Sequence, residues 1–293
     1  MSAPTRTPPR RPRRAPSGRL TGGVLASYLP VLLYALTLVL PLYWLVISAF
    51  KPPIDVVDSP FTPTFAAGVS HFVEVWDLLD MGPALLSSVY ITAGSLLLTL
   101  VLAVPAAYAL ARSGGRVATL LERVYALGFL IPGFAALVPT LLLAIELKMF
   151  QQREFMILYL PASAQPLAVI LLTQFMRAVP PALEESATID GAGRLRILWS
   201  VYLPLTIPGI AAVSILNFIT FWNEYLYTLV IVGVNTQRRT VQVALPTLLG
   251  NQGITDYALV CAGTVLAVVP VFVVYAILNR RMENALVQGA LKG

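Results

Sequence analysis

The stretch EESATIDGAGRLRILWSVYLPLTIP, residues 184–208, is a polar interlude between two long apolar runs. Two prolines, 180 and 181, precede it, and proline suits the first turn of a helix because its missing N–H needs no partner there. Asp190-Gly191 is a turn signal, since glycine tolerates positive φ and an aspartate side chain can cap a following helix. Apolar residues then recur at helical spacing: Leu195, Leu198 and Tyr202. The pattern predicts a helix over residues 183–189, a sharp turn, and a second helix that Pro204 and Pro208 interrupt.

The composition around this stretch is that of a membrane protein. Of the 293 residues, 57% are hydrophobic and 12% are charged, and the mean hydropathy is +0.78. A soluble domain carries about 25% charged residues, so a soluble globule is excluded. The net charge of +6 is explained by topology rather than by a nucleic-acid partner, which we do not expect. A single cysteine, Cys261, and a single histidine, His71, exclude an internal disulfide and argue against a metal site.

Six apolar runs are each near or above the ~20 residues that span a bilayer. They cover approximately residues 24–48, 84–111, 118–145, 155–176, 205–232 and 257–278. We therefore predict an all-α membrane protein with six transmembrane helices, over residues 24–279. Before this domain we expect a disordered basic tail, residues 1–23, and after it a short C-terminal tail, residues 280–293. In the third and fourth runs, kinks are expected at proline and glycine positions: Pro132, Gly133, Pro139, Pro161 and Pro166.

The basic residues predict the orientation of the helices. With the N-terminus inside the cell, fifteen of the 20 lysines and arginines fall in inner segments and five in outer ones. The positive-inside rule therefore places both termini, and residues 184–202, in the cytoplasm. The outer segment 51–83 is long and acidic, and two interpretations stay open for it: a solvated loop, or a docking surface for an external partner. Segment 233–256 has the same two interpretations.

The fifth run contains an acidic residue well inside a predicted span, Glu224. Asn217, Thr220 and Glu224 stand at i, i+3 and i+7, so a continuous helix would place them on one face. Further polar and aromatic residues surround them: Trp222, Asn223, Tyr225 and Tyr227. A carboxylate in hydrocarbon is costly, so Glu224 should face the bundle interior or water. The face either lines a solute pathway, with hydrogen bonds for hydroxyls and rings for stacking on a sugar, or joins helices by hydrogen bonds.

The polar interlude resembles the "EAA" coupling motif, E-A-A-x-x-D-G-A followed by a distant Leu-Pro, of ABC import permeases. The matching positions are Glu185, Ser186, Ala187, Asp190, Gly191, Ala192, Leu203 and Pro204, and Ser186 stands in place of the usual first alanine. The phrase FWNEY, residues 221–225, and the final GALKG, residues 289–293, resemble stretches of the carbohydrate-uptake branch, the maltose-type inner permeases. The resemblance implies a type I importer bundle in which residues 181–203 are cytoplasmic coupling helices that dock on an ATPase.

The same resemblance implies the partners of the chain. They are a second, different permease, two ATPase subunits, an external solute-binding protein, a sugar and the lipid of a bacterial cytoplasmic membrane. The alternatives are an ABC permease for polyamines, phosphate or another ion, and, in a different class, a secondary transporter to which no ATPase binds.

No catalytic site is predicted. A phosphate-cradling loop needs G-x-x-x-x-G-K-[ST], and none of the three lysines, at 51, 148 and 292, stands in that pattern. We therefore expect no enzyme activity and no cofactor in this chain, with ATP and Mg²⁺ bound by the separate ATPase subunits. Binding proteins usually set selectivity in such importers, so the identity of the sugar does not follow from this sequence.

Overall fold

The structure is a computed structural model that describes the backbone of residues 22–249 and 256–290 and the side chains of residues 28–249 and 256–277. The predicted basic tail up to residue 21, and residues 291–293 of the GALKG ending, lie outside the described residues. The chain divides into two units, residues 1–44 and 45–293, which are described separately.

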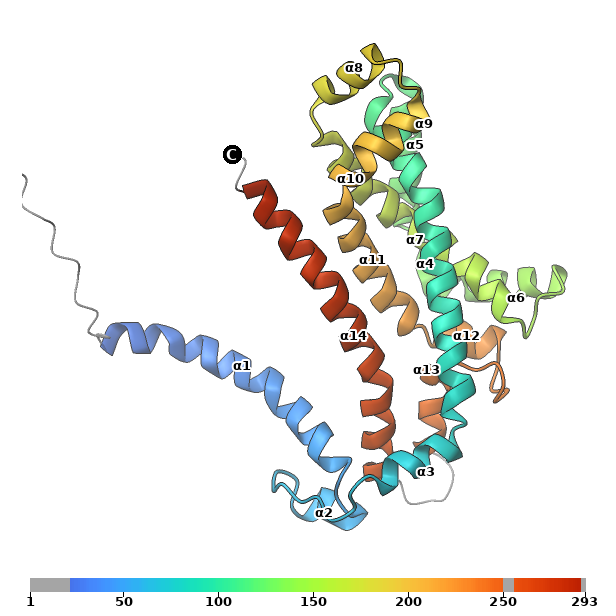
Figure 1. The fold of residues 1–293 in the computed structure, drawn as a ribbon. Helices are drawn as coiled ribbons and strands as arrows, with labels where there is room; N and C mark the ends of the chain where they lie inside the picture. Colours follow the sequence, from blue (N-terminus) through green and yellow to red (C-terminus); the bar gives the residue numbers. More distant parts are fainter. Residues whose placement is uncertain (1–21, 250–255, 291–293) are drawn as a thin grey trace, which may run out of the picture. The chain divides into compact units, whose positions relative to one another are not determined.

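Within the described residues, all regular secondary structure is helical (Figure 1). Helix α1 (Gly22–Ser48) makes up the described part of the first unit and reaches into the second. The second unit contains these further elements: α2 (Pro53–Asp58), α3 (Ser70–Leu78), α4 (Met81–Arg112), α5 (Arg116–Gly128), η1 (Gly133–Ala136), α6 (Leu137–Glu146), α7 (Arg153–Arg177), α8 (Pro181–Ile189), α9 (Arg194–Ile197), η2 (Leu198–Tyr202), α10 (Leu203–Leu205), α11 (Ile207–Trp222), α12 (Leu226–Ile231), α13 (Val241–Ala244), η3 (Leu245–Leu249) and α14 (Tyr257–Ala290).

Four helices in the described part of the chain are long and apolar enough to cross a membrane: α1, α4, α7 and α14. Two bent helix pairs bring the number to six if each pair is one span. The first pair is α5 with η1 and α6, which meet at 88°, and the second joins residues 194–205 to α11 at 75°. The third apolar run is therefore not a single continuous helix, and the fifth run, residues 205–232, is divided between α11 and α12.

The third run is broken at an expected position, whereas the fourth run forms one continuous helix. The third run breaks at residues 129–132, immediately before the 3₁₀ turn η1, where Pro132 lacks the N–H that would continue the helix. Helix α7, in contrast, runs unbroken through Pro161 and Pro166. Pro166 packs against α5, because a Cβ built on Gly128 would lie 2.6 Å from its Cγ. The proline of α7 therefore contributes to helix packing rather than to a break.

Small residues allow the long helices to approach closely. Ala103 and Ala107 of α4 and Ala168 of α7 are completely buried in one apolar cluster. A Cβ on Gly94 would lie 3.0 Å from Ile157, and one on Gly209 would lie 2.4 Å from the Phe175 ring. Without a hydrophobic driving force in lipid, helices associate through such close packing. The core that supports the functional segments is therefore α4, α7 and α11.

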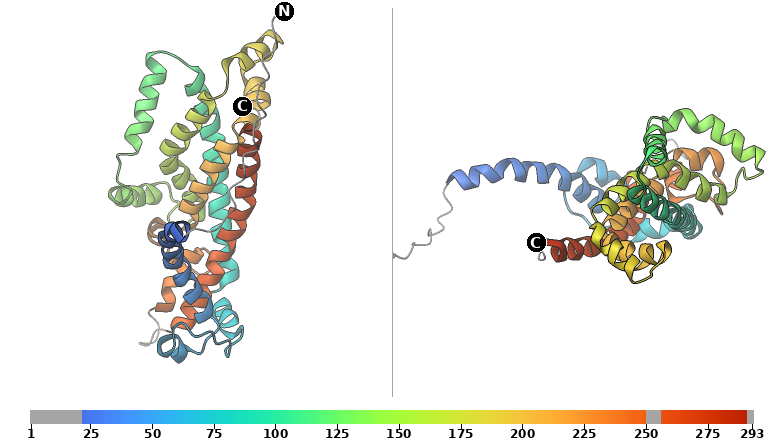
Figure 2. Two further views of the ribbon diagram at one scale, coloured as in Figure 1. Left: turned by 90° about the vertical axis from the view of Figure 1, so that its left-hand side faces the viewer. Right: turned by 90° about the horizontal axis from the view of Figure 1, so that it is seen from above.

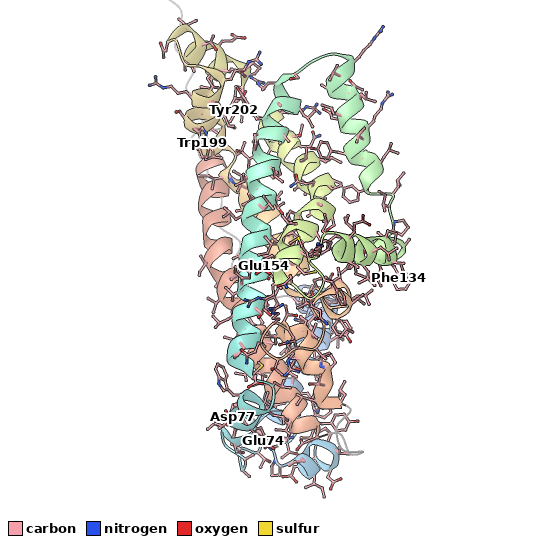
Figure 3. The ribbon with its side chains drawn as sticks, turned by 90° about the vertical axis from the view of Figure 1, so that its right-hand side faces the viewer. Glu74, Asp77, Phe134, Glu154, Trp199 and Tyr202 are labelled. Carbon is pink, nitrogen blue, oxygen red and sulfur yellow. The ribbon has the colours of Figure 1, made fainter. Side chains whose placement is uncertain are left out.

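The connecting segments of the second unit lie at opposite ends of the long helices. Helices α8 and α9 lie at one end and α2 and α3 at the other (Figures 1 and 2). We call these the α8 end and the α3 end. At the α3 end the predicted outer loop 51–83 contains two short helices, and buried Lys51 donates to the carbonyls of Ser59 (2.6 Å) and Pro60 (3.0 Å). Figure 3 shows Glu74 and Asp77 at this end, with Trp199 and Tyr202 at the α8 end.

Candidate functional site

The polar interlude begins as the sequence predicts. Pro180 is the N-cap of α8, with φ −58°, and Pro181 is its first residue. No residue of the nine-residue helix is buried, so α8 lies on the surface. Glu185 and Ser186 are exposed, and the Ser186 hydroxyl donates to the carbonyl of Ala182 at 2.9 Å. The hydroxyl that replaces the motif's usual alanine is therefore satisfied within the helix.

The turn after α8 is a Schellman motif. Gly191 has φ +80°, its N–H donates to the Thr188 carbonyl at 3.0 Å, and the N–H of Ala192 donates to the Ala187 carbonyl at 2.9 Å. This is the 6→1 and 5→2 pattern that closes a helix with glycine at C′. Ala187 and Ala192 both pack against the apolar core cluster, which gives the contact that accompanies the motif. One local structure, the Schellman turn, thus explains three motif positions: Ala187, Gly191 and Ala192.

The predicted capping role of Asp190 is wrong. The residue that caps α9 is Gly193, with φ −73°, and no side chain accepts a hydrogen bond at that N-cap. Asp190 is instead the last residue before the left-handed glycine, with its backbone N–H bonded to the Ser186 carbonyl at 3.0 Å. Its exposed carboxylate has no structural role in the described chain, so it is free for a partner.

A polar cluster that the sequence did not reveal fixes α8 to the bundle. The guanidinium Nε of Arg112, in the last turn of α4, donates to Oε2 of Glu184, and the Tyr202 hydroxyl donates to the same oxygen at 2.9 Å. The guanidinium lies over the Tyr202 ring, 5.2 Å from its centroid, and the Tyr108 ring packs on Tyr202 at 4.9 Å. We call Glu184, Arg112, Tyr202 and Tyr108 the Glu184 cluster. These residues lie up to 94 positions apart in the chain, and no sequence motif contains them all. They are related only by their proximity in the folded structure.

The Glu184 carboxylate is held in its charged form. Burial alone would raise the pKa of this carboxyl, but the hydrogen bonds from Arg112 and Tyr202 and the positive charge of Arg112 outweigh burial and hold the pKa below its ordinary value. The pair is therefore an ion pair at neutral pH. An open cavity of about 700 Å³ lies beside it, lined by residues of α4 and α8 that include Arg112, Glu184, Glu185 and Ile189.

The second helix of the interlude is irregular. After one α-helical turn, residues 198–202 form a π-helical turn, and π turns are rare and frequent at functional sites. Leu203 packs partly against the core cluster, whereas Pro204 is exposed. The Thr206 hydroxyl and N–H both bond the Tyr202 carbonyl, at 2.7 and 2.9 Å, just before the 75° bend into α11. Leu203 and Pro204 therefore lie at the joint between the interlude and a spanning helix.

The α8 end also exposes large apolar side chains. Ile189 is 86% exposed, Leu195 73% and Trp199 64%. Leu198 and Tyr202 are buried, so Leu195 does not join them on the buried face as its spacing suggested. A cluster of exposed apolar residues next to polar ones is characteristic of an interaction surface. In this chain that surface coincides with the segment that resembles the coupling motif.

The predicted pathway face is not continuous. Helix α11 ends at Trp222, so Glu224 lies in the break before α12 and does not share a helical face with Asn217 and Thr220. Asn217 is only 4% exposed, whereas Thr220 is exposed and donates its hydroxyl to the Leu216 carbonyl at 2.9 Å. At the break, Glu224 stands one residue before Tyr225, the N-cap of α12, and its Oε1 accepts the backbone N–H of Tyr227 at 2.7 Å.

The neighbouring residues divide into packing and surface groups. Trp222 is buried and its indole N–H donates to the Ala267 carbonyl of α14 at 3.2 Å, so its ring is not available to a solute. Asn223 is exposed and accepts a hydrogen bond from Gln242 at 3.3 Å. Tyr225 is exposed, whereas Tyr227 is buried and stacks on Tyr159 with centroids 4.3 Å apart. The surface group at the break is therefore Asn223, Glu224 and Tyr225, with Thr220 one turn before.

The side chains in the described part of the chain include no cluster of three or more histidine, cysteine or acidic residues able to hold a metal ion. Cys261 is buried and free.

Comparison with known families gives the arrangement an identity. The family model described as binding-protein-dependent transport system inner membrane component matches residues 95–284, from the middle of α4 to the last helix, with the Glu184–Pro204 interlude inside the match. The chain belongs to this family. Its members are permeases of ABC importers, membrane transport components rather than catalysts, and the predicted all-α membrane fold is confirmed.

Relatives of this permease cover nearly the whole chain. It is 30% identical to the diacetylchitobiose uptake system permease protein NgcG of Streptomyces coelicolor, over 91% of this chain and 88% of the relative. It is 29% identical to the melibiose/raffinose/stachyose import permease protein MelC of Bacillus subtilis, over 87% of this chain and 91% of the relative. A solved bacterial ABC transporter involved in the import of the acidic polysaccharide alginate matches its fold with a TM-score of 0.76 at 23% identity, over 92% of this chain and 99% of that chain.

Proposed function

We propose that this permease is one half of the membrane pathway of an ATP-driven importer of sugars. The observation that carries the proposal is the α8–α10 segment: its helix, Schellman turn and Leu-Pro joint stand at the residues that match the coupling motif of the family. The relatives named for diacetylchitobiose and for melibiose, raffinose and stachyose support a mono- or oligosaccharide as the solute.

The proposed complex contains a second permease, two ATPase subunits that bind ATP and Mg²⁺, and an external solute-binding protein. The α8 end faces the cytoplasm, as the distribution of basic residues predicts, in a bacterial cytoplasmic membrane. The coupling residues are Glu185, Ser186, Ala187, Asp190, Gly191, Ala192, Leu203 and Pro204. Among them, exposed Glu185 and Asp190 contact the ATPase directly, and the residues of the Schellman turn and the joint hold the backbone that presents them.

The surface group at the α11–α12 break forms part of the pathway wall. Asn223 and Thr220 offer hydrogen bonds to sugar hydroxyls, and Tyr225 offers a ring face. Asn217 and Trp222, which the sequence also pointed to, are buried and support the wall from behind. The experiment is reconstitution of both permeases with the ATPases and the binding protein in proteoliposomes, followed by uptake of labelled sugars. Sugar uptake that depends on internal ATP supports the proposal; uptake driven by an ion gradient without ATPases indicates a secondary transporter.

The role of Glu224 distinguishes a sugar permease from a permease for a cationic solute. Among the described residues its half-buried carboxylate has no basic partner, and a polyamine permease would use that charge. For a neutral sugar the carboxylate serves to cap α12, and an amide oxygen can accept the same bond from Tyr227. We therefore expect Glu224→Gln to retain most of the sugar uptake. Loss of uptake by this variant, with normal assembly, would instead favour a polyamine.

A further inference from the structure

Helix α8 needs an anchor that apolar packing does not supply. None of its residues is buried, and its one partly buried apolar residue that packs against the core cluster, Ala187, is small. A surface helix of nine residues has little stability by itself, because isolated helices shorter than about 12–15 residues are marginal in water. A helix that receives force from an ATPase would move independently of the bundle unless something fixes it.

The Glu184 cluster supplies that anchor, and it joins three elements at one carboxylate oxygen. Arg112 belongs to the last turn of α4, Tyr202 to the π turn η2 that leads to α11, and Glu184 to α8 itself. Hydrogen bonds to a charged acceptor are about twice as strong as neutral ones. The Arg112 guanidinium is also confined between the carboxylate and the Tyr202 ring. Displacement of α8 along or away from α4 therefore breaks several interactions together.

The two adjacent glutamates both line the open cavity beside Arg112, but their contacts differ. Glu184 is turned to the bundle, whereas Glu185, one residue further round the helix, is exposed and has no partner in the described structure. Successive residues of a helix point about 100° apart, so one face is available for a partner while the other is bound to α4. Force on the exposed face passes through Glu184 to α4 and η2.

We propose that Glu184 is a positioning residue that makes α8 move with α4 and α11 as one body, and that Glu185 and its exposed neighbours, not Glu184, form the docking face. The inference rests on the proposed function, because it assigns Glu184 a part in coupling. Loss of the anchor should leave the ATPase attached to α8 while the movement of the ATPase no longer reaches the spanning helices.

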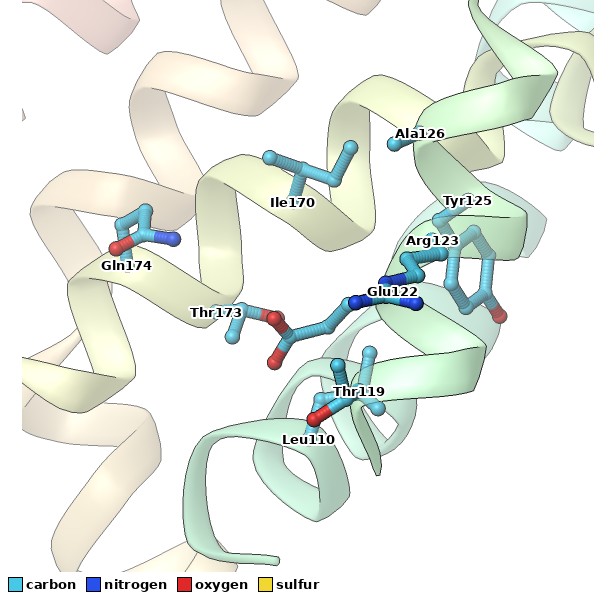
Figure 4. Close-up of a pocket in the computed structure, with 9 residues that line it drawn as sticks. All are labelled: Leu110, Thr119, Glu122, Arg123, Tyr125, Ala126, Ile170, Thr173 and Gln174. Atoms are coloured by element: carbon cyan, nitrogen blue, oxygen red, sulfur yellow. The ribbon is translucent and has the colours of Figure 1, made fainter. Parts of the chain in front are cut away.

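A second ion pair in the same chain offers a matched control. Arg177 at the end of α7 pairs with Glu122 of α5, with both side chains more exposed than those of the Glu184 pair. Glu122 lines a cavity of about 380 Å³ between α4, α5 and α7, and the residues given for its lining include none from α8 (Figure 4). Glu122→Gln removes the same chemistry as Glu184→Gln without touching α8, so it controls for the general loss of a surface ion pair, which is typically worth little.

The first experiment measures the anchor directly. Spin labels are placed at Ile189→Cys in α8 and Leu97→Cys in α4, both exposed, in a Cys261→Ala background of the full permease pair in lipid nanodiscs. With Glu184→Gln or Tyr202→Phe, which keeps the ring and removes only the hydroxyl, the width of the label–label distance distribution should increase by about twofold or more. With Glu122→Gln it should stay that of the parent. An unchanged narrow distribution in both Glu184→Gln and Tyr202→Phe would overturn the proposal.

The second experiment measures coupling in proteoliposomes with the ATPases and the binding protein. Glu184→Gln should retain the ATPase subunits at the parent level. The amount of sugar taken up per ATP hydrolysed should fall by roughly 5-fold or more, which corresponds to the lower end of typical coupling free energies. Parent uptake per ATP in Glu184→Gln would overturn the positioning role, and loss of the ATPase from this variant would place Glu184 in the docking face instead. If the parent complex shows no ATP-driven uptake, the proposed function fails, whereas the nanodisc distances still decide whether Glu184 anchors α8.

Discussion

Replacement of Gly191 by valine tests the Schellman turn at the end of α8. Gly191 has φ +80°, and a Cβ built on it meets no heavy atom within 4 Å. The substitution therefore causes no clash, and its whole cost is conformational. The left-handed region costs an L-residue about 1–2 kcal/mol, and a β-branched side chain lies at the upper end. A cost of that size lowers the equilibrium constant for forming the turn by roughly 5–30-fold.

Two glycines of the same chain provide controls that separate strain from position. Gly193 has φ −73° and open space around its Cβ position, so Gly193→Val adds the same side chain two residues away without the left-handed cost. Gly233 has the same φ as Gly191, +80°, and equally open space, but follows α12. Gly233→Val therefore imposes the same strain outside the coupling segment.

The assay is ATP hydrolysis stimulated by the solute-loaded binding protein in proteoliposomes, with the amount of permease in the membrane measured by immunoblot. We expect Gly191→Val to insert normally and to lose most of the stimulation, because the equilibrium constant for forming the turn is roughly 5–30-fold lower. Gly193→Val and Gly233→Val should retain stimulation. Parent-level stimulation in Gly191→Val, or an equal loss in Gly193→Val, would refute the assignment of this turn to coupling.

Two further predictions address the docking face and the pathway. Glu185→Lys should reduce the amount of ATPase that copurifies with the permease. The exposed carboxylate has no partner within the described chain, so the loss would reflect a contact with the ATPase, and an acidic substitution on the ATPase should restore part of the binding. Capture of the ATPase equal to that of the parent would exclude this contact. In a Cys261→Ala background, Thr220→Cys should react with a water-soluble thiol reagent faster than Asn217→Cys, because Thr220 is exposed and Asn217 is buried. If α11 lines an alternating pathway, ATP should change the labelling rate of Thr220→Cys. Protection of Thr220→Cys in every nucleotide state would show that this face packs against another helix.

Local sequence rules predicted the parts of this fold that local physics determines. Proline at the start of α8 and glycine at its end follow from backbone geometry alone, and both are confirmed at Pro181 and Gly191. The apolar segments follow from length and hydropathy in the same way. These rules do not predict contacts between helices: the ring of Pro166 in α7 packs where Gly128 of α5 has no side chain.

Glu224 shows how a correct observation led to a wrong geometry. The apolar run around Glu224 predicts a continuous helix, which would place the carboxylate on the face of Asn217 and Thr220. The same carboxylate, however, can satisfy the orphan N–H groups at a helix start, and in the structure it accepts the N–H of Tyr227. A carboxylate that caps a helix marks a break rather than a face. The spacing i, i+3, i+7 therefore has meaning only after the helix bounds are known.

The Glu184 cluster was missed for a different reason, which concerns what a motif can contain. A sequence motif consists of positions that are close in the chain. It therefore identifies residues whose roles depend on local backbone conformation or on a partner that binds the whole segment. Arg112 lies 72 positions before Glu184, and its role depends on the place where α4 ends. Glu184 and Glu185 are indistinguishable as letters, yet the 100° turn between them gives one to the bundle and the other to the surface. Coupling needs two faces of α8: one that binds a partner and one that is bound to the bundle. The motif describes only the face that binds the partner.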